Sequence, residues 1–193
     1  MSELHVEPGV VDRVRAAMAA TPRARFLPPV VRHLADADRP VGIGWDATSS
    51  QPSTVARMLE LLDAGPGHRV LDVGAGSGWT AAILEELGSA VTGVELVPQL
   101  VEAANANLAA HGRRARVRQA TPHVLGLPDD APFDRILVSA DLWRMPDALV
   151  AQLADGGRMV APVAGRMTVV DVRDGRPHAR EDRGRYAFVP LRE

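Results

Sequence analysis

The 193-residue chain contains no cysteine and no lysine, and aromatic residues make up only 4% of it. Without cysteine there is no disulfide framework, no thiol nucleophile and no thiolate metal site. All 22 basic residues are arginines and the formal net charge is −2, so the charge balance gives no sign of a nucleic-acid-binding face. The six histidines are scattered without the spacing of a metal-binding pair, and we expect no metal site.

Long apolar runs are also missing. No stretch approaches the ~18 apolar residues of a membrane-spanning helix. Residues 1–7 lack the basic start and the apolar stretch of a signal peptide. We therefore expect a cytoplasmic protein that does not bind membranes. The length favours a single domain over 1–193, which we expect to be a monomer, with a cap and substrate loop over 1–50 and a Rossmann-like core over 51–193.

The most informative segment is a glycine-rich turn between a strand-like and a helix-like pattern. Residues 70–73 form an apolar, β-favouring run, glycines follow at 74, 76 and 78, and helical spacing starts at Trp79. Such a turn brings unpaired N–H groups of a helix start close to an anionic ligand, with no Cβ in the way. A second β-like run ends at Glu95, whose carboxylate can accept hydrogen bonds from both hydroxyls of a ribose. The G-x-G-x-G spacing differs from the G-x-G-x-x-G of dinucleotide folds and favours S-adenosylmethionine (SAM) as the cofactor.

From residue 69 onward, strand and helix patterns alternate along the chain. This alternation predicts an α/β, doubly wound, mostly parallel sheet covered on both faces. Ahead of the sheet, we expect an N-terminal helical cap that ends at Pro22, irregular structure over 23–47 and a helix that begins near Pro52. After it, 167–173 and 186–191 are expected to form a closing antiparallel pair. The expected strands are 69–73, 90–95, 115–118, 135–139 and 158–162, and the expected helices between them are 79–87, 98–110 and 146–153.

In such a sheet the ligand lies beyond the carboxyl ends of the strands, where the winding reverses. The loops after Val73, Glu95 and Ser139 are therefore expected to line one crevice, with 119–123 near the adenine. The residues expected to bind the cofactor are Asp72, Gly74, Ala75, Gly76, Ser77, Gly78, Glu95, Leu96, Thr121 and His123.

Two further segments carry a resemblance to a known family. Segment 43–52 (IGWDATSSQP) resembles the substrate loop of the protein-L-isoaspartate O-methyltransferases, and 131–136 (APFDRI) resembles their characteristic run before the fourth strand. The glycine turn, 156–163 and 188–191 are also similar. The resemblance implies an enzyme that uses SAM to methylate an isoaspartyl or aspartyl carboxylate of a protein or peptide, with Thr48 and Ser50 as catalytic residues. The substrate-binding residues that it implies are Trp45, Asp46, Thr48, Ser49, Ser50, Asp141 and Trp143.

Three places depart from the family pattern. Ser49 stands where the family usually has isoleucine. Pro122 stands where the family carries an acid that meets the adenine amino group, so we expect that contact to fall to the backbone or to His123 and Gln119. After the fourth strand, Asp141 and Trp143 stand where small residues usually leave room for the peptide. The cofactor half of the family pattern is therefore retained, whereas the acceptor half is altered.

Because the acceptor half is altered, the sequence leaves the identity of the methyl acceptor undecided. A carboxylate has a pKa near ~4, so it is ionised at neutral pH and needs no general base, only positioning by hydroxyl donors. Asp46 and Asp141 would repel such an acceptor, or serve a hydroxyl or amine acceptor as a base, or else point to solvent or pair with one of the many arginines. The three tryptophans either pack in the core or line an acceptor pocket. The alternatives are a tailoring methyltransferase for a dedicated peptide or small molecule, and a SAM-binding protein without catalysis.

Overall fold

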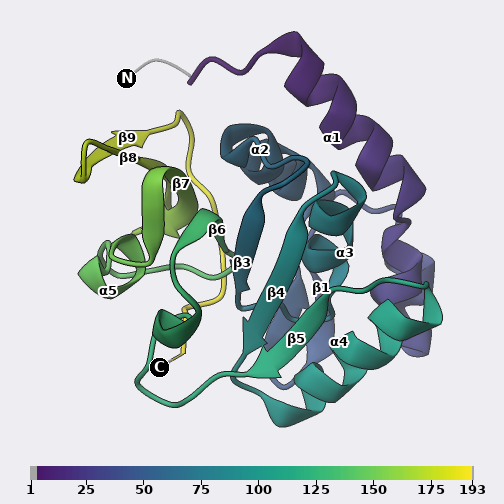
Figure 1. The fold of residues 1–193 in the computed structure, drawn as a ribbon. Coiled ribbons are helices and arrows are strands. Elements are labelled where there is room, and N and C mark those ends of the chain that lie inside the picture. The colour runs from purple at the N-terminus through teal and green to yellow at the C-terminus, as the bar shows by residue number, and fades with distance from the viewer. Residues whose placement is uncertain (1–3, 193) are drawn as a thin grey trace.

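The computed structural model describes residues 4–192, and the ends of the expected domain, 1–3 and 193, lie outside the described residues. The strands of its large sheet are β3 (Arg69–Val73), β4 (Ala90–Glu95), β5 (Arg116–Gln119), β6 (Phe133–Val138), β7 (Leu153–Val163), β8 (Arg166–Arg173) and β9 (Arg176–Glu181). Their order across the sheet is β5-β4-β3-β6-β7-β8-β9 (Figure 1). Strands β3 to β7 are parallel, and β8 and β9 extend the sheet as antiparallel strands.

This strand order confirms the doubly wound fold. The chain runs outward from β3 to β4 and β5, then returns to β6 on the other side of β3 and continues to β7. The winding therefore reverses between β3 and β6, and a crevice forms there beyond the carboxyl ends of the strands. The ends of β3, β4 and β6 meet at that edge, as the sequence predicted.

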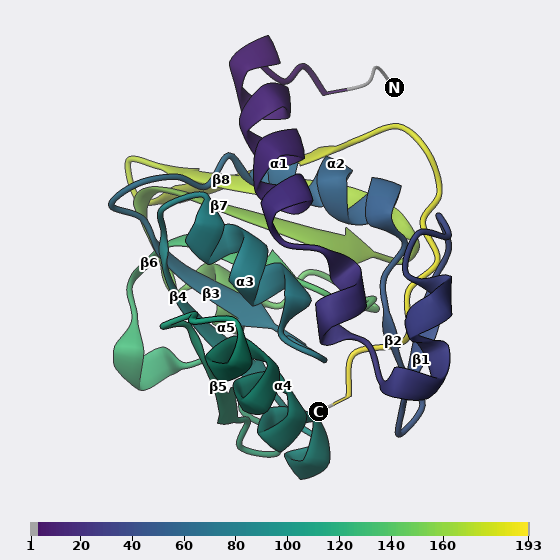
Figure 2. The ribbon, with the colours of Figure 1, turned by 90° about the vertical axis from the view of Figure 1, so that its right-hand side faces the viewer.

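Helices cover the two faces of the sheet unequally. They are α1 (Pro8–Ala20), α2 (Pro52–Leu62), α3 (Trp79–Glu86), α4 (Pro98–Ala110) and α5 (Asp147–Val150). On one face, α2, α3 and α4 bury Leu59, Ile83 and Leu108 in the same core as strand residues, and α1 packs outside α2 and α3 (Figure 2). On the other face, the short α5 contributes Leu149 to a smaller core. The predicted helix 146–153 is thus only four residues long, because β7 already begins at Leu153.

Prolines start three of the four long helices. Pro8, Pro52 and Pro98 each occupy a first position in their helix. The N–H group that proline lacks would have no partner inside the helix at that position, so proline can start a helix without the loss of a hydrogen bond. Helix α2 ends at Asp63, which adopts the left-handed conformation with φ 49°.

The cap between α1 and α2 is more regular than the sequence predicted. It contains the short 3-10 helices η1 (Arg23–Phe26) and η2 (Pro29–Leu34), followed by a hairpin of β1 (Val41–Gly44) and β2 (Ala47–Ser49). The turn of this hairpin has Trp45 at φ 52° and Asp46 at φ 57°. Two consecutive positive φ angles usually require glycine or asparagine, so the sequence offered no signal for this turn.

The expected pairing of 167–173 with 186–191 is wrong. Strand β8 instead pairs with β9, through a turn in which Asp174 has φ 51° and Gly175 has φ 67°. Asp-Gly is a strong signal for such a hairpin, but every residue of β9 is exposed, so the strand lacks the apolar alternation that would reveal it. The segment 186–191 runs instead past the loop after β6, where the Asp141 N–H donates to the carbonyl of Val189 at 2.8 Å.

Candidate functional site

Glycines at alternate positions suit the conformation of the turn after β3. Gly74, Gly76 and Gly78 have φ angles of 78°, 52° and 84°, a region that other residues enter only with strain. A Cβ added to Gly76 would lie 3.3 Å from the Cδ1 atom of Ile43 in the hairpin above it. The turn therefore lets the hairpin approach the strand ends and leads directly into α3.

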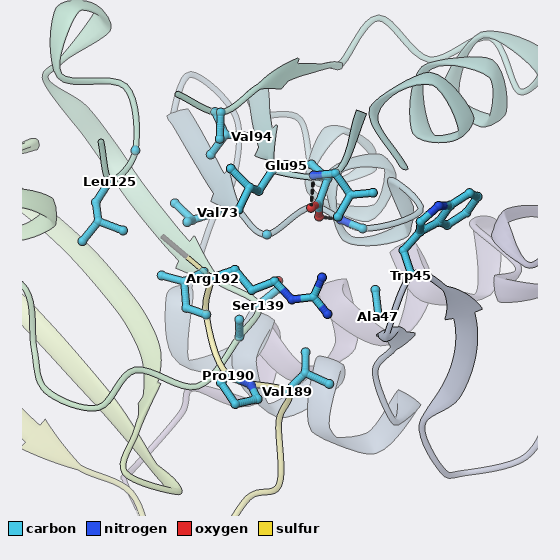
Figure 3. A pocket seen from close by; sticks show the side chains of 18 of the residues that line it. Trp45, Ala47, Val73, Val94, Glu95, Leu125, Ser139, Val189, Pro190 and Arg192 are labelled. Carbon is cyan, nitrogen blue, oxygen red and sulfur yellow. Dashed lines mark hydrogen bonds between the residues drawn. The ribbon is translucent and has the colours of Figure 1, made fainter. Parts of the chain in front are cut away.

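Glu95 lies at the end of β4 and faces this turn. Its Oε2 accepts a hydrogen bond from the Gly76 N–H and its Oε1 accepts one from the Val97 N–H, both at 3.0 Å (Figure 3). These two bonds hold the half-buried carboxylate in place. Each carboxylate oxygen can accept a second hydrogen bond, so the group stays available to a ligand.

A cleft with about 800 Å³ of free space opens over these strand ends. Four segments form its walls: the strand ends with the glycine turn, the loop 120–126, the β1–β2 hairpin and the C-terminal tail 189–192 (Figure 3). A smaller pocket of about 320 Å³ adjoins it beneath the hairpin. The residues that line both spaces are Thr48, Gly74, Gly76 and Ser139.

Most of the residues predicted to bind the cofactor line these spaces. Gly78 lines neither, because it begins α3 and packs against Ala104 and Leu108. Pro122 also lines neither, although its two neighbours line the cleft. The predicted residues that line the cleft are Gly74, Gly76, Glu95, Leu96, Thr121 and His123, and those that line the smaller pocket are Gly74, Ala75, Gly76 and Ser77.

The structure corrects the expected position of Asp72, which lies beneath the cleft rather than in its wall. The side chain is fully buried, and its two oxygens accept hydrogen bonds from the hydroxyls of Thr80 at 2.7 Å and Ser139 at 3.2 Å. Burial raises the pKa of the Asp72 carboxyl to about 6; the two hydroxyl bonds oppose this shift and the charge of Glu95 adds to it. Asp72 therefore ties β3 to α3 and to the end of β6.

Arg23 holds the β1–β2 hairpin in place from below. Its guanidinium donates to the Ser49 hydroxyl at 3.0 Å, to the Ser49 carbonyl at 2.8 Å and to the Arg39 carbonyl at 3.0 Å, and it lies 5.6 Å from the ring centre of Trp79. Burial lowers the pKa of Arg23, and the nearby Asp38 carboxylate opposes that shift. Ser49, which is expected to bind substrate, lines the smaller pocket, and its hydroxyl accepts from this buried cation. The serine that replaces the family's isoleucine thus has a structural partner.

The other residues of the hairpin face the cleft as the sequence predicted. Trp45 and Asp46 line the large cleft, and Thr48 lines both spaces. Ser50, just after β2, lines the smaller pocket. Of the two proposed hydroxyl donors, Thr48 therefore sits where the cleft and the pocket join, and Ser50 sits in the pocket.

The structure decides between core packing and an acceptor pocket separately for each of the three tryptophans. Trp143 is 90% exposed and lines neither space. Trp79 is buried in the core, where its indole N–H donates to the Thr21 carbonyl at 2.9 Å, and it borders only the smaller pocket. Trp45 alone of the three lines the large cleft, because only the hairpin turn brings an indole to that side.

Asp141 also lies away from both spaces, contrary to the expectation that it lines the acceptor site. Its Oδ1 accepts a hydrogen bond from the Gly165 N–H at 3.1 Å, and its backbone carbonyl accepts from the Leu191 N–H at 2.8 Å. The residue therefore fastens the C-terminal tail and the turn before β8 to the loop after β6.

The C-terminal tail forms a wall of the cleft that the sequence did not predict. Val189, Pro190, Leu191 and Arg192 all line it, although this segment was expected to be a strand. The available signal was Pro190, because a residue without an N–H rarely sits inside a sheet ladder. Among residues 4–192, no group of three or more histidines and acids could hold a metal ion. In the same residues, no helix is both long and apolar enough to span a membrane.

Comparisons with known proteins agree with this geometry. The family model of protein-L-isoaspartate(D-aspartate) O-methyltransferase matches residues 3–193. A protein-L-isoaspartate O-methyltransferase of Aeropyrum pernix is 46% identical over 188 residues, covering 93% of this chain and 72% of the relative. One of Methanoregula boonei is 46% identical over 187 residues, covering 95% and 86%.

A solved structure has the same fold. It is a Plasmodium falciparum protein assigned as a protein-L-isoaspartate O-methyltransferase, in complex with S-adenosyl-L-homocysteine, with a TM-score of 0.81 and 24% identity over 94% of this chain and 90% of that one. With the family model matched along nearly the whole chain, the chain belongs to the protein-L-isoaspartate(D-aspartate) O-methyltransferase family, and it is a SAM-dependent methyltransferase.

Proposed function

We propose that the protein transfers the methyl group of SAM to the free carboxylate of isoaspartyl residues in proteins or peptides. The observation that carries this proposal is the junction of the cleft and the smaller pocket, where Thr48 and Ser139 face the glycine turn. Family membership supports the same acceptor. SAM supplies a methyl group made electrophilic by a positively charged sulfur.

The residues of the cleft fit this cofactor. Gly74 and Gly76 leave room for close approach of a ligand to the backbone, and the fixed carboxylate of Glu95 can accept from the ribose hydroxyls. Thr121 and His123 would border the adenine, and Ser77 would lie on the side of the methionine part. With Pro122 outside the lining, recognition of the adenine amino group falls to the backbone or to His123.

The acceptor chemistry suits a site that offers donors rather than a base. An ionised carboxylate oxygen forms the new C–O bond as the S–C bond breaks, so opposite charges cancel and no proton has to move. The hydroxyls of Thr48 and Ser50 would hold the acceptor in line, and the rate would come mainly from positioning. Glu95 is already held by two N–H groups, and Asp46 is 96% exposed beside Arg192. Neither acid is placed as the general base that a hydroxyl or amine acceptor requires.

The family acts on protein substrates, and we propose a protein or peptide partner for this chain as well. Action as a monomer in the cytoplasm, without nucleic acid or membrane, belongs to the same proposal, and it rests on composition and charge.

The test is transfer of tritiated methyl groups from SAM to a pair of peptides that differ only in one isoaspartyl or aspartyl residue. We expect base-labile methyl esters on the isoaspartyl peptide alone. Intact SAM binding without ester on either peptide would refute the proposal in favour of a dedicated acceptor or of a SAM-binding role without catalysis.

Hydroxyl variants locate the acceptor within the site. Ser50→Ala and Thr48→Val are each expected to lower transfer about tenfold with little change in SAM affinity, because each removes one donor to a charged acceptor. Thr54→Val, in the first turn of α2 and outside both spaces, is the matched control and should behave like the parent protein.

A further inference from the structure

One charged side chain in the cleft wall has no role in the function described so far. Among the described residues that line the cleft, Arg192 is the one arginine. It extends from the C-terminal tail, and Figure 3 shows its guanidinium pointing toward the hairpin that carries Trp45 and Ala47, on the side of the cleft opposite Glu95.

The ion pair that Arg192 forms is suited to exchange. One guanidinium nitrogen lies 3.5 Å from the Oδ2 atom of Asp46, and the two side chains are 49% and 96% exposed. An exposed pair with a single long contact contributes little free energy, because water solvates both partners well. A carboxylate that enters the cleft would meet the same guanidinium in a less hydrated place and could form two parallel hydrogen bonds with it.

We propose that Arg192 is an acceptor-binding residue, and that it exchanges Asp46 for the carboxylate of the incoming isoaspartyl residue. The inference rests on the proposed function and adds how this chain recognises the charge of its acceptor. Asp46 holds the guanidinium across the mouth of the cleft before the acceptor binds. When the acceptor replaces it, each carboxylate oxygen accepts one hydrogen bond from Arg192, and a second lone pair of one oxygen stays free for the methyl group.

The exchange also accounts for an acid in the acceptor wall. Asp46 alone would repel an anionic acceptor, whereas Asp46 paired with Arg192 adds no net charge to the mouth. The exchange makes the two residues interdependent, so the effect of removing Asp46 on peptide binding depends on whether Arg192 is present. A general repulsion between Asp46 and the acceptor would not depend on Arg192, so a double-mutant cycle separates the two.

The test uses the full chain, with methyl transfer to the isoaspartyl peptide and binding of that peptide to the protein saturated with S-adenosyl-L-homocysteine as separate readouts. Arg192→Gln is expected to weaken peptide binding and raise its KM about tenfold, with kcat and SAM affinity within about twofold of the parent. Arg192→Lys should recover part of the loss, because a lysine keeps the charge but not the bidentate geometry.

Asp46→Asn is expected to tighten peptide binding about threefold in the parent, and by clearly less once Arg192 is glutamine, because only the repulsion by Asp46 is then relieved and no competition for Arg192 remains. The matched controls come from an exposed ion pair on α1, Arg15 with Asp12 at 3.6 Å, whose side chains are 77% and 75% exposed. Arg15→Gln and Asp12→Asn change the charge in the same way at a site that borders no described pocket, and both should leave peptide binding unchanged.

Each outcome decides one of the two proposals. Transfer by the parent with a parent-like KM and peptide affinity in Arg192→Gln overturns the role of Arg192 and leaves the function standing. Peptide binding that depends on Arg192 without any transfer overturns the function and leaves the role of Arg192 standing. A parent that neither binds nor methylates the peptide overturns both. An equal effect of Asp46→Asn in both backgrounds overturns the exchange.

Discussion

The cofactor side and the acceptor side of the cleft are built in different ways. The cofactor side comes largely from one continuous stretch, β3 to β4, where the glycine turn and Glu95 follow from local conformation and from the parallel register of two neighbouring strands. The acceptor side joins the hairpin, the loop after β6 and the tail, which lie about 150 residues apart at the extremes and are fastened by Arg23 and Asp141. Local sequence rules therefore apply to the first side, whereas the second depends on long-range contacts.

The largest expected effect is on the acceptor side, at Arg23. Arg23→Ala leaves several buried carbonyls and the Ser49 hydroxyl without their donor, and we expect it to lower the free energy of unfolding by about 4 kcal/mol. Arg23→Lys should restore only part of this, because an ammonium cannot reach partners spread around a planar guanidinium. Urea denaturation measures both. A parent-like midpoint for Arg23→Ala would mean that the hairpin is held by its own strand pairing.

Next comes the centre of the cofactor side. Glu95→Ala should weaken SAM binding about a hundredfold, since losing charge-assisted hydrogen bonds costs about 3 kcal/mol. Glu95→Gln keeps the shape of the side chain and should show an intermediate loss. Calorimetric titration with SAM is the measurement. A folded Glu95→Ala protein with the affinity of the parent would show that the ribose is held elsewhere.

Asp72 links the two sides, and its effect depends on pH. Its folded pKa of about 6 lies above its ordinary value of 3.8, so the folded state binds the proton more tightly than the unfolded state does. The contribution of Asp72 to stability is therefore fully present below about pH 4 and is lost as the pH rises to about 6, a change of at most about 3 kcal/mol. Asp72→Asn should remove this slope and be more stable than the parent at about pH 7.5, by about 2 kcal/mol.

Denaturation of Asp72→Asn and the parent across this pH range measures the difference directly. Asp12→Asn, at an exposed acid of α1, should leave the slope unchanged. A slope that persists in Asp72→Asn would assign the titration to another group.

A smaller effect is expected where the tail is fastened. Asp141→Ala should lower the free energy of unfolding by about 1 kcal/mol, because the Gly165 N–H loses its acceptor while the backbone bonds to the tail remain. Asp141→Asn keeps an acceptor oxygen and should be as stable as the parent. Thermal melts of the parent and both variants measure the difference. If Asp141→Ala abolished methyl transfer without a change in stability, Asp141 would be acting on the acceptor after all.

The smallest effect is expected at Trp143. The side chain is 90% exposed and lies outside both spaces, so Trp143→Ala should change stability by less than about 0.5 kcal/mol and leave methyl transfer to a short peptide unchanged. Steady-state kinetics with the isoaspartyl peptide measures this. A clear rise in KM would bring this loop back into the acceptor site.

The sequence was sufficient for the parts of the molecule in which local pattern and strand order act together. The parallel strands, the switch point between β3 and β6 and the position of Glu95 all follow from alternating periodicity and from the glycine turn. Asp72 shows the limit of this reasoning: the motif identifies the residue, but only the packed structure shows that Thr80 and Ser139 occupy both of its oxygens beneath the cleft.

On the acceptor side, the sequence does not show which chain segments contact one another. A tight turn at Trp45 and Asp46 has no glycine to reveal it, and the exposed residues of β9 show no apolar alternation. Without a visible signal for β9, the pattern favours the apolar tail as the partner of β8. Nothing in the residues around Arg192 indicates that they face a hairpin some 145 positions earlier, because that contact depends on the fold as a whole.

The position of the tail has a practical consequence for handling the protein. Val189 to Arg192 form part of the cleft wall, so a purification tag or a fluorescent fusion joined at that end would begin beside the mouth of the cleft. A surface-immobilised sample attached there would have its ligand entrance against the support. At the other end, the Leu4 N–H donates to the buried carboxylate of Asp182 and the Leu4 carbonyl accepts from Arg57. A label attached ahead of that anchored residue leaves the entrance clear, and is the better choice for binding measurements.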